Sequence, residues 1–202
     1  MSEPRERPAM FIQTQSTPNP ETLKFLPGRD VSPGMTYEFT TEVEAAASPL
    51  AQALFAIRGV RGVFLGEDFV SITKAVEADW APLKPQALAA IMDHFVAGGP
   101  MMFSAGPTRR EASVEDETVY DGETAEIVAE IKELIATRVR PAVAQDGGDI
   151  IFKRFDVDTG IVHLTMHGAC SGCPSSTATL KQGVENLLRH YVPEVTAVEA
   201  VA

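Results

Sequence analysis

The stretch Gly168-Ala169-Cys170-Ser171-Gly172-Cys173-Pro174 lies between two segments with different hydrophobic periods. Residues 160–166 before it alternate as a β-strand does, whereas residues 174–191 after it carry apolar side chains at helical spacing. Proline is favoured at the first helical position, so Pro174 predicts a helix that begins directly after Cys173. The stretch therefore predicts a strand, a loop that carries a Cys-x-x-Cys pair, and a helix.

The start of a helix is a favourable place for a thiolate. Its free backbone N–H groups and the positive end of its dipole stabilise a nearby anion. This lowers the pKa of a thiol there, and the thiolate is the form that binds metal. The residues around and between the cysteines are small, so a bulky group could approach the backbone. We therefore expect Cys170 and Cys173 to lie as thiolates in an exposed loop.

These two are the only cysteines of the 202 residues. A disulfide between them would close a tiny loop and stabilise almost nothing. A secreted, disulfide-stapled chain would carry more cysteines, spread along its length. The pair therefore indicates metal or redox chemistry in a reducing compartment.

Several interpretations of the pair stay open on this ground. The cysteines could be incidental and buried. They could form a thioredoxin-type dithiol, although too few residues follow Cys173 for the strands and helices that come after that motif. They could form half of a metal site, because zinc and iron–sulfur centres commonly need four ligands and two copies of this loop would supply four thiolates.

The nearby histidines could change the metal interpretation. His167 precedes Cys170 by three residues and could complete a zinc site within one chain. We favour a role for His167 as a loop residue or as a neighbour of a ligand. We expect His163 to be a half-exposed strand residue.

The segments around the pair predict the rest of this unit. Apolar residues at helical spacing over 127–143 predict a helix that Pro141 should kink or end. Residues 150–155 and 160–166 predict a hairpin, and residues 195–201 predict a final strand. Asp146 and Asp149 flank two glycines, and we expect them to form a turn and cap N–H groups rather than bind a hard metal or catalyse.

The chain before this unit has a different pattern. It predicts strands over 10–15, 22–26, 36–41, 62–65 and 69–73, and helices over 49–57 and 80–96. It contains no cysteine and one histidine, His94, to which we assign no function. We expect this unit to recognise partners rather than to hold a metal.

Between the two units the chain is acidic and nearly free of strongly apolar residues, which is typical of a linker. We therefore predict an α+β fold of two small α+β domains joined by a flexible acidic linker. The first domain covers residues 10–103, the linker residues 104–121, and the second domain residues 122–201. The second should have the order helix, hairpin, Cys-x-x-Cys loop, helix, strand.

The net charge of −11 argues against nucleic acid and against an anionic membrane surface as partners. No stretch approaches the roughly 18 apolar residues that a membrane span needs. Residues 1–8 alternate acids and bases, which is typical neither of a secretory signal nor of a transit peptide. We therefore expect the bacterial cytoplasm, with the mitochondrial matrix as the alternative.

Longer runs carry a family resemblance. The runs 140–149 (RPAVAQDGGD), 168–176 (GACSGCPSS) and 180–185 (LKQGVE) closely resemble the carboxy-terminal domain of the NifU family, the Nfu-type iron–sulfur scaffolds. The opening run 10–25 (MFIQTQSTPNPETLKF) resembles the amino-terminal domain that precedes it in many members. The run Asp-Gly-Gly-Asp together with Gly-x-Cys-x-x-Cys-Pro is far more specific than the cysteine pair alone.

The resemblance implies a scaffold or carrier and not an enzyme. Such proteins assemble a cluster, usually [4Fe–4S] with [2Fe–2S] as the alternative, shared between two subunits. On this chain the ligands would be Cys170 and Cys173 of each protomer. The resemblance also implies a homodimer on cluster binding, upstream cluster donors, and apo iron–sulfur proteins as clients.

Overall fold

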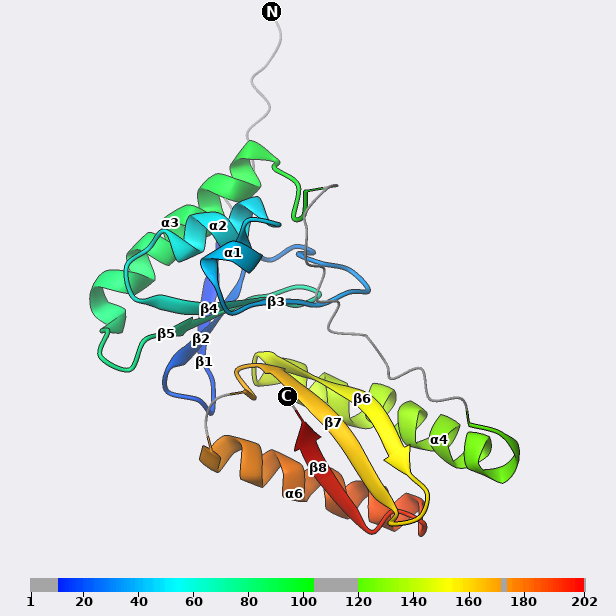
Figure 1. Ribbon diagram of the computed structural model, residues 1–202. Coiled ribbons are helices and arrows are strands. Elements are labelled where there is room, and N and C mark those ends of the chain that lie inside the picture. The colour runs from blue at the N-terminus through cyan, green and yellow to red at the C-terminus, as the bar shows by residue number, and fades with distance from the viewer. Residues whose placement is uncertain (1–10, 104–119, 172–173, 202) are drawn as a thin grey trace, which may run out of the picture.

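The computed structural model describes residues 11–103, 120–171 and 174–201. Within these residues the strands form two sheets, and each sheet has its own hydrophobic core and its own helices. This is the expected α+β architecture. Figure 1 shows the first domain, residues 11–103, above the second domain, residues 120–171 and 174–201. The predicted linker lies mostly outside the described residues, so the domain boundaries stay a prediction.

The first domain is an antiparallel sheet with helices on one face (Figure 1). Its strands are β1 (Gln13–Ser16), β2 (Thr22–Leu26), β3 (Tyr37–Phe39), β4 (Val60–Leu65) and β5 (Val70–Lys74), in the order β1-β2-β5-β4-β3. Its helices are α1 (Glu42–Ala45), α2 (Pro49–Phe55) and α3 (Trp80–Ala97). Phe25 and Ile72 from the sheet pack with Leu54 and Ile91 from the helices, all fully buried.

Local signals account for the ends of these helices. Ser48 caps α2 by accepting a hydrogen bond from the backbone N–H of Ala51 at 3.2 Å, and Pro49 occupies the first turn. Asp79 caps α3 in the same manner. Gly98 ends α3 with a left-handed φ of 68°, which glycine adopts without the strain of a side chain.

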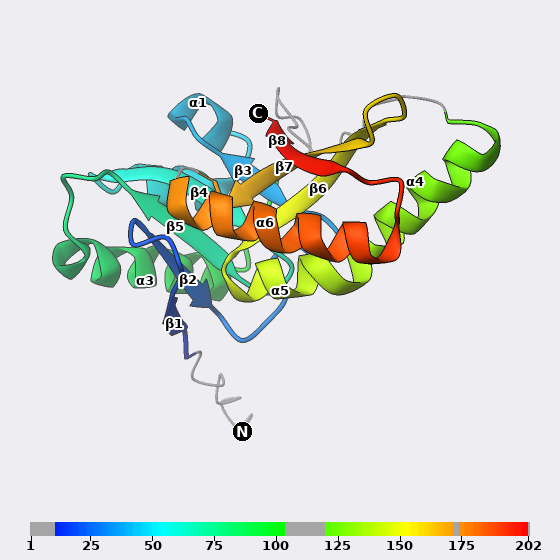
Figure 2. The same ribbon diagram turned by 90° about the horizontal axis from the view of Figure 1, so that it is seen from below.

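The second domain begins with α4 (Gly122–Leu134), the π-helical turn η1 (Ile135–Val139) and α5 (Arg140–Gln145). The strands β6 (Gly148–Asp156) and β7 (Ile161–Gly168) form an antiparallel hairpin. Helix α6 (Pro174–Tyr191) then leads to β8 (Ala197–Val201), which pairs in parallel with β7. The helices lie along one face of this sheet (Figure 2), and the predicted element order is confirmed. Among the helices described, none is long and apolar enough to cross a membrane.

Pro141 does not end its helix. Proline lacks an N–H, and its ring clashes with the carbonyl four residues earlier, which here belongs to Thr137. The helix widens over Ile135–Val139 and continues as α5 with Pro141 in the first turn. A π-helical turn is a known way to absorb such an interruption. The interruption therefore falls one turn before the proline.

The second face of the first sheet is covered by the second domain rather than by water. Strand alternation places Lys24, Phe64 and Ser71 on the face away from α2 and α3. All three are buried, with exposed fractions of 6%, 2% and 1%. An antiparallel sheet often leaves one face solvated, but here the second domain lies beneath that face (Figure 1). The contacts between β4 and β7 bring the loop after β7 against the first domain.

Candidate metal centre

Cys170 lies in the turn directly after β7. The backbone N–H of Ser171 donates to the carbonyl of Gly168 at 3.1 Å and closes this turn. The hydroxyl of Thr177, in the first turns of α6, donates to the carbonyl of Cys170 at 3.0 Å. The strand–loop–helix setting predicted from the sequence is therefore present. Cys173 lies outside the described residues, so its position stays a prediction.

The predicted exposed setting is wrong for Cys170. Its side chain is 6% exposed and belongs to the hydrophobic core of the second domain. Burial, together with the nearby carboxylates of Asp146 and Asp149, raises the pKa of the Cys170 thiol to about 12, and burial is the largest of these causes. In this conformation the thiol is protonated at neutral pH, because desolvation opposes the thiolate that a metal needs.

Gly147, just before β6, and Gly148, its first residue, allow the turn after β7 that carries Cys170 to pack closely against them. A Cβ added at Gly148 would lie 2.7 Å from Cys170 Sγ and 2.5 Å from the carbonyl oxygen of His167. Gly147 has a φ of 82°, which side chains rarely adopt, and its carbonyl accepts the backbone N–H of Ala169 at 3.1 Å. The two glycines therefore have two roles. They form a tight turn, and they let the start of β6 pack closely against the turn that carries Cys170.

Asp149 has the structural role that was predicted. Its carboxylate forms a two-point ion pair with Arg140, with Nε–Oδ1 and Nη2–Oδ2 distances of 2.8 and 2.7 Å. It also accepts the backbone N–H of Ile150 at 2.8 Å. These bonds join the start of α5 to the start of β6 and hold the turn that contacts Cys170.

The two histidines of β7 differ from each other. His163 is 6% exposed, so its expected half-exposed setting is wrong, and its Nδ1 lies 3.8 Å from Glu199 Oε2. His167 Nδ1 lies 2.5 Å from Glu38 Oε2 and is therefore engaged by the first domain. Within the described residues, no group of three or more His, Cys, Asp or Glu side chains is placed to hold a metal ion.

A cavity of about 520 Å³ opens beside Cys170, between η1–α5 and α6. Val143, Leu180 and Val184 form much of its wall, and Pro18 of the first domain contributes to its lining. Cys170 is part of the same wall. The cavity therefore places apolar surface and the first domain next to the thiol.

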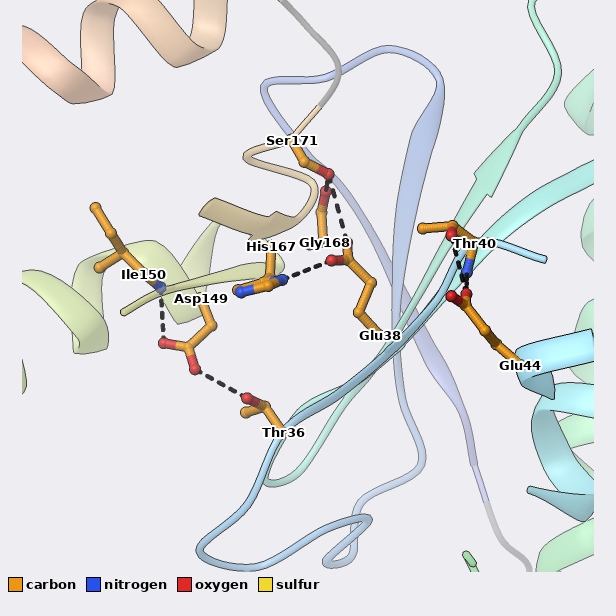
Figure 3. A network of polar contacts seen from close by, with 9 residues as sticks. All are labelled: Thr36, Glu38, Thr40, Glu44, Asp149, Ile150, His167, Gly168 and Ser171. Atoms are coloured by element: carbon orange, nitrogen blue, oxygen red, sulfur yellow. Dashed lines mark hydrogen bonds and ion pairs between the residues drawn. The ribbon is translucent and has the colours of Figure 1, made fainter. Parts of the chain in front are cut away.

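The first domain reaches the loop with two side chains that the sequence did not single out. Glu38 of β3 accepts the backbone N–H of Gly168 at 2.9 Å, and Asn19 Nδ2 donates to the carbonyl of Ser171 at 3.4 Å. Figure 3 shows Glu38 pointing from β3 toward His167, Gly168 and Ser171. Nothing in the local pattern around Glu38 or Asn19 marks them, because the contact joins positions far apart in the chain.

Comparison with known proteins identifies the family. A family model described as "Scaffold protein Nfu/NifU N terminal" matches residues 12–98, and one described as "NifU-like domain" matches residues 131–199. The mitochondrial NifU-like protein 5 of Arabidopsis thaliana is 50% identical over 194 residues, which are 96% of this chain and 69% of that protein. The chain belongs to the Nfu/NifU scaffold family. The resemblance inferred from the sequence runs is confirmed, and this family is one of scaffold proteins rather than of enzymes.

Other relatives cover the chain to the same extent. The NFU1 iron–sulfur cluster scaffold homolog, mitochondrial, of Drosophila erecta is 51% identical over 196 residues, which are 96% of this Nfu/NifU chain and 66% of that relative. The chain thus spans just under two thirds of that protein. The solution structure of a NifU-like protein from Saccharomyces cerevisiae matches 52% of this chain and 94% of its own, at 26% identity and a TM-score of 0.43.

The expected location in the bacterial cytoplasm is wrong. The Drosophila and Arabidopsis relatives of this Nfu/NifU chain are named mitochondrial, which points to mitochondria instead. The expectation rested on the composition of residues 1–8. Eight residues of mixed charge do not determine a compartment, so the inference had no physical basis beyond that pattern.

Proposed function

We propose that this chain is an iron–sulfur cluster scaffold that holds a [4Fe–4S] cluster between two protomers and delivers it to apoproteins. The ligands in this proposal are Cys170 and Cys173 of each protomer. The observation that carries it is the position of Cys170, in the loop between β7 and α6 of a NifU-like domain. Membership in a scaffold family supports a carrier function over catalysis.

The ligand count supports sharing of the cluster. Iron–sulfur clusters of this type are held by four thiolates, and this chain contains two cysteines. A symmetric dimer presents the same loop twice about its two-fold axis and so completes the set. A chain with four cysteines of its own could enclose the cluster, whereas a site divided between subunits can come apart.

Burial of Cys170 bears on how such a site would work. Cys170 is 6% exposed, so iron reaches its sulfur only after the loop moves, and the thiol proton that the iron displaces then passes to water. The loop must therefore move when a cluster is loaded. After the cluster leaves, Cys170 can return to its buried, protonated state. This return favours release of the cluster, because the loop is then stable without it.

The partners follow from this function. We propose upstream cluster donors, apo iron–sulfur clients, and a second copy of the chain. The first domain would take part in recognition of clients or donors, since none of its described residues is a cysteine. The names of the relatives favour a mitochondrial setting for these exchanges.

Anaerobic reconstitution with iron and sulfide tests the proposal. After gel filtration we expect a dimer with about four irons and four sulfides, the content of one [4Fe–4S] cluster. A chain that stays monomeric and free of iron would contradict it. A dimer with about two irons and two sulfides would retain the shared site but replace the cluster type by [2Fe–2S].

Variants separate the proposed ligands from the alternatives. Cys170→Ser and Cys173→Ser should each abolish stable cluster binding, and full binding by either would remove that residue from the ligand set. His167→Gln should still bind the cluster after reconstitution. A different result would favour a zinc site within one chain. In that case the parent chain would bind one zinc, His167→Gln would bind none, and neither the parent nor the variant would bind a cluster.

A further inference from the structure

We infer that Glu38 of the first domain is a positioning residue for the turn at residues 168–171, here called the cysteine loop, which it holds in the form in which Cys170 is buried. This inference deepens the proposed function, since it assigns the first domain a role at the cluster site. Loading and release of a cluster then require the contact between Glu38 and the loop to open.

The first argument is the set of bonds that Glu38 makes. Its Oε1 accepts the backbone N–H of Gly168 at 2.9 Å and lies 3.5 Å from the hydroxyl of Ser171. Its Oε2 lies 2.5 Å from Nδ1 of His167 (Figure 3). One carboxylate therefore engages the end of β7 and both sides of Cys170. Hydrogen bonds to an ionised acceptor are among the stronger ones in proteins.

The second argument is the close packing at the same place. Gly168 has a left-handed φ of 65°, and a Cβ there would lie 2.7 Å from the carbonyl oxygen of Gly147 and 3.0 Å from the ring of Phe64. Phe64 belongs to β4 of the first domain. The loop thus turns directly on the surface of the first sheet, with no room for a side chain between them.

A further tie holds the other end of the turn. Asn19, which is 4% exposed, donates from Nδ2 to the carbonyl of Ser171 at 3.4 Å. Cys170 is therefore flanked on both sides by residues bound to the first domain. Its sulfur is part of the second domain's core while these ties are intact.

Sharing a cluster is incompatible with this arrangement. Metal–thiolate bonds are about 2.3 Å long, so the sulfur must reach the surface to meet iron held by another chain. A side chain that is 6% exposed does not reach it. Movement of Cys170 requires movement of its neighbours Gly168 and Ser171, and these are the residues that Glu38 and Asn19 hold. The first domain consequently controls access to the ligand.

Alkylation of Cys170 in the cluster-free full chain tests this directly. In a Cys173→Ser background, only Cys170 can react with iodoacetamide, and mass spectrometry gives its rate. Glu38→Ala should raise that rate at least tenfold, because about 1.4 kcal/mol from the loss of only one of its three contacts already corresponds to that factor. Glu38→Gln keeps one acceptor oxygen, so its rate should lie between those of the parent and Glu38→Ala.

Glu185 provides a matched control. Its side chain is 17% exposed against 21% for Glu38, and it accepts the backbone N–H of Val198 at 3.1 Å within the second domain. Glu185→Gln should leave the alkylation rate of Cys170 unchanged. An equal rise in Glu185→Gln and Glu38→Gln would overturn the inference, because it would indicate general loosening. Unchanged rates in both Glu38 variants would overturn it as well.

Far-UV circular dichroism and thermal melting check that the variants are folded. If Glu38→Ala is unfolded, the comparison of Glu38→Gln with Glu185→Gln decides by itself. The experiment uses no iron, so it is independent of the proposed function. Faster alkylation in the Glu38 variants, with no cluster bound after reconstitution, would retain the positioning role of Glu38 and reject the scaffold proposal. Unchanged alkylation in these variants, with a cluster bound after reconstitution, would reject the positioning role alone.

Discussion

Cys170 packs so closely against Gly148 that no side chain larger than that of glycine fits at position 148. Gly148 has no positive φ, so its requirement for glycine comes from space alone. A Cβ at this position would collide with Cys170 Sγ and with a backbone oxygen, and a backbone atom cannot move aside cheaply. The glycine is therefore part of the site although it carries no chemistry.

Gly148→Ala should destabilise the chain by about 1–3 kcal/mol, the usual cost of overpacking a dense interior. Urea unfolding measures this change. The matched control is Gly183→Ala in α6, where an added Cβ meets nothing within 4 Å. Because alanine is the better helix former, Gly183→Ala should be neutral or stabilising by up to about 1 kcal/mol. Equal stability of both variants would contradict the close packing described for Gly148.

The raised pKa of Cys170 predicts a loss of stability in alkaline solution. The folded-state pKa of about 12 exceeds the ordinary value of 9.0, so the unfolded chain loses this proton first as the pH rises. The contribution is complete below pH 9.0 and is lost as the pH rises toward 12. Relative to Cys170→Ala, the free energy of unfolding should fall with a slope approaching about 1.4 kcal/mol per pH unit.

Chemical denaturation of both proteins between pH 8 and pH 10.5 gives the two slopes. Both chains contain Cys173, so its contribution cancels in the comparison. Parallel curves would mean that Cys170 is accessible to water in the folded apo chain.

At the residue scale, the sequence predicted where Cys170 lies along the chain but not what surrounds it in space. The position of Cys170 after a strand followed from the change in hydrophobic period. Its burial did not, because small neighbours in the sequence say nothing of what covers them in space. Glu38 and Asn19 were missed for the same reason.

At the scale of elements, β6 is an edge strand whose outer backbone groups need partners. Tyr120, just before α4, supplies them. Its hydroxyl accepts the backbone N–H of Phe155 at 2.7 Å and donates to the carbonyl of the same residue at 3.1 Å. Covering an edge in this way protects it from pairing with other chains.

Tyr120→Phe should lower the free energy of unfolding by about 1–2 kcal/mol, because two backbone groups at a partly buried edge lose their partner. Thermal or urea unfolding measures it. Tyr191→Phe is the control, since Tyr191 is 40% exposed and its hydroxyl accepts a hydrogen bond from the exposed side chain of Arg138 at 2.9 Å. That variant should change stability by less than about 0.5 kcal/mol. A larger effect for Tyr191→Phe than for Tyr120→Phe would refute the assignment.

Long helices and strands were easier to predict than short or irregular ones. The hairpin and α6 followed from period and from turn residues, since these signals are local. The short helix α1 was not predicted, because four residues carry no periodicity. The π-helical turn before Pro141 was also missed, since the sequence marks where proline lies and not how the preceding turn relaxes.

At the scale of the whole molecule, the first sheet meets the second domain through buried polar groups. Lys24 Nζ donates to the carbonyl of Ala144 at 2.7 Å, at the end of α5 where helix carbonyls lack partners. Ser71 Oγ donates to the carbonyl of Gly147 at 2.6 Å. In the sequence, Lys24 fits an ordinary solvated strand face, and its burial follows only from the position of the second domain.

Lys24→Met should loosen the contact between the domains while keeping the apolar stem over the ring of Phe69, which the ammonium faces at 4.4 Å. Burial lowers the pKa of Lys24, and the nearby carboxylates of Asp68 and Asp146 oppose that shift. Without this bond the domains should separate more often. The amide of Gly168, which Glu38 holds, should then exchange with deuterium about tenfold faster for each 1.4 kcal/mol lost.

Lys74→Met is the matched control for this exchange experiment. Lys74 lies on β5 of the same sheet, is 9% exposed and pairs with Glu21 inside the first domain. Its loss should lower the stability of the first domain without a selective effect on Gly168. Selective acceleration in Lys24→Met alone would mean that the interface, rather than the stability of either domain, keeps the cysteine loop closed. Equally faster exchange of the Gly168 amide in both variants would instead mean that the stability of the first domain, rather than the interface, keeps the loop closed.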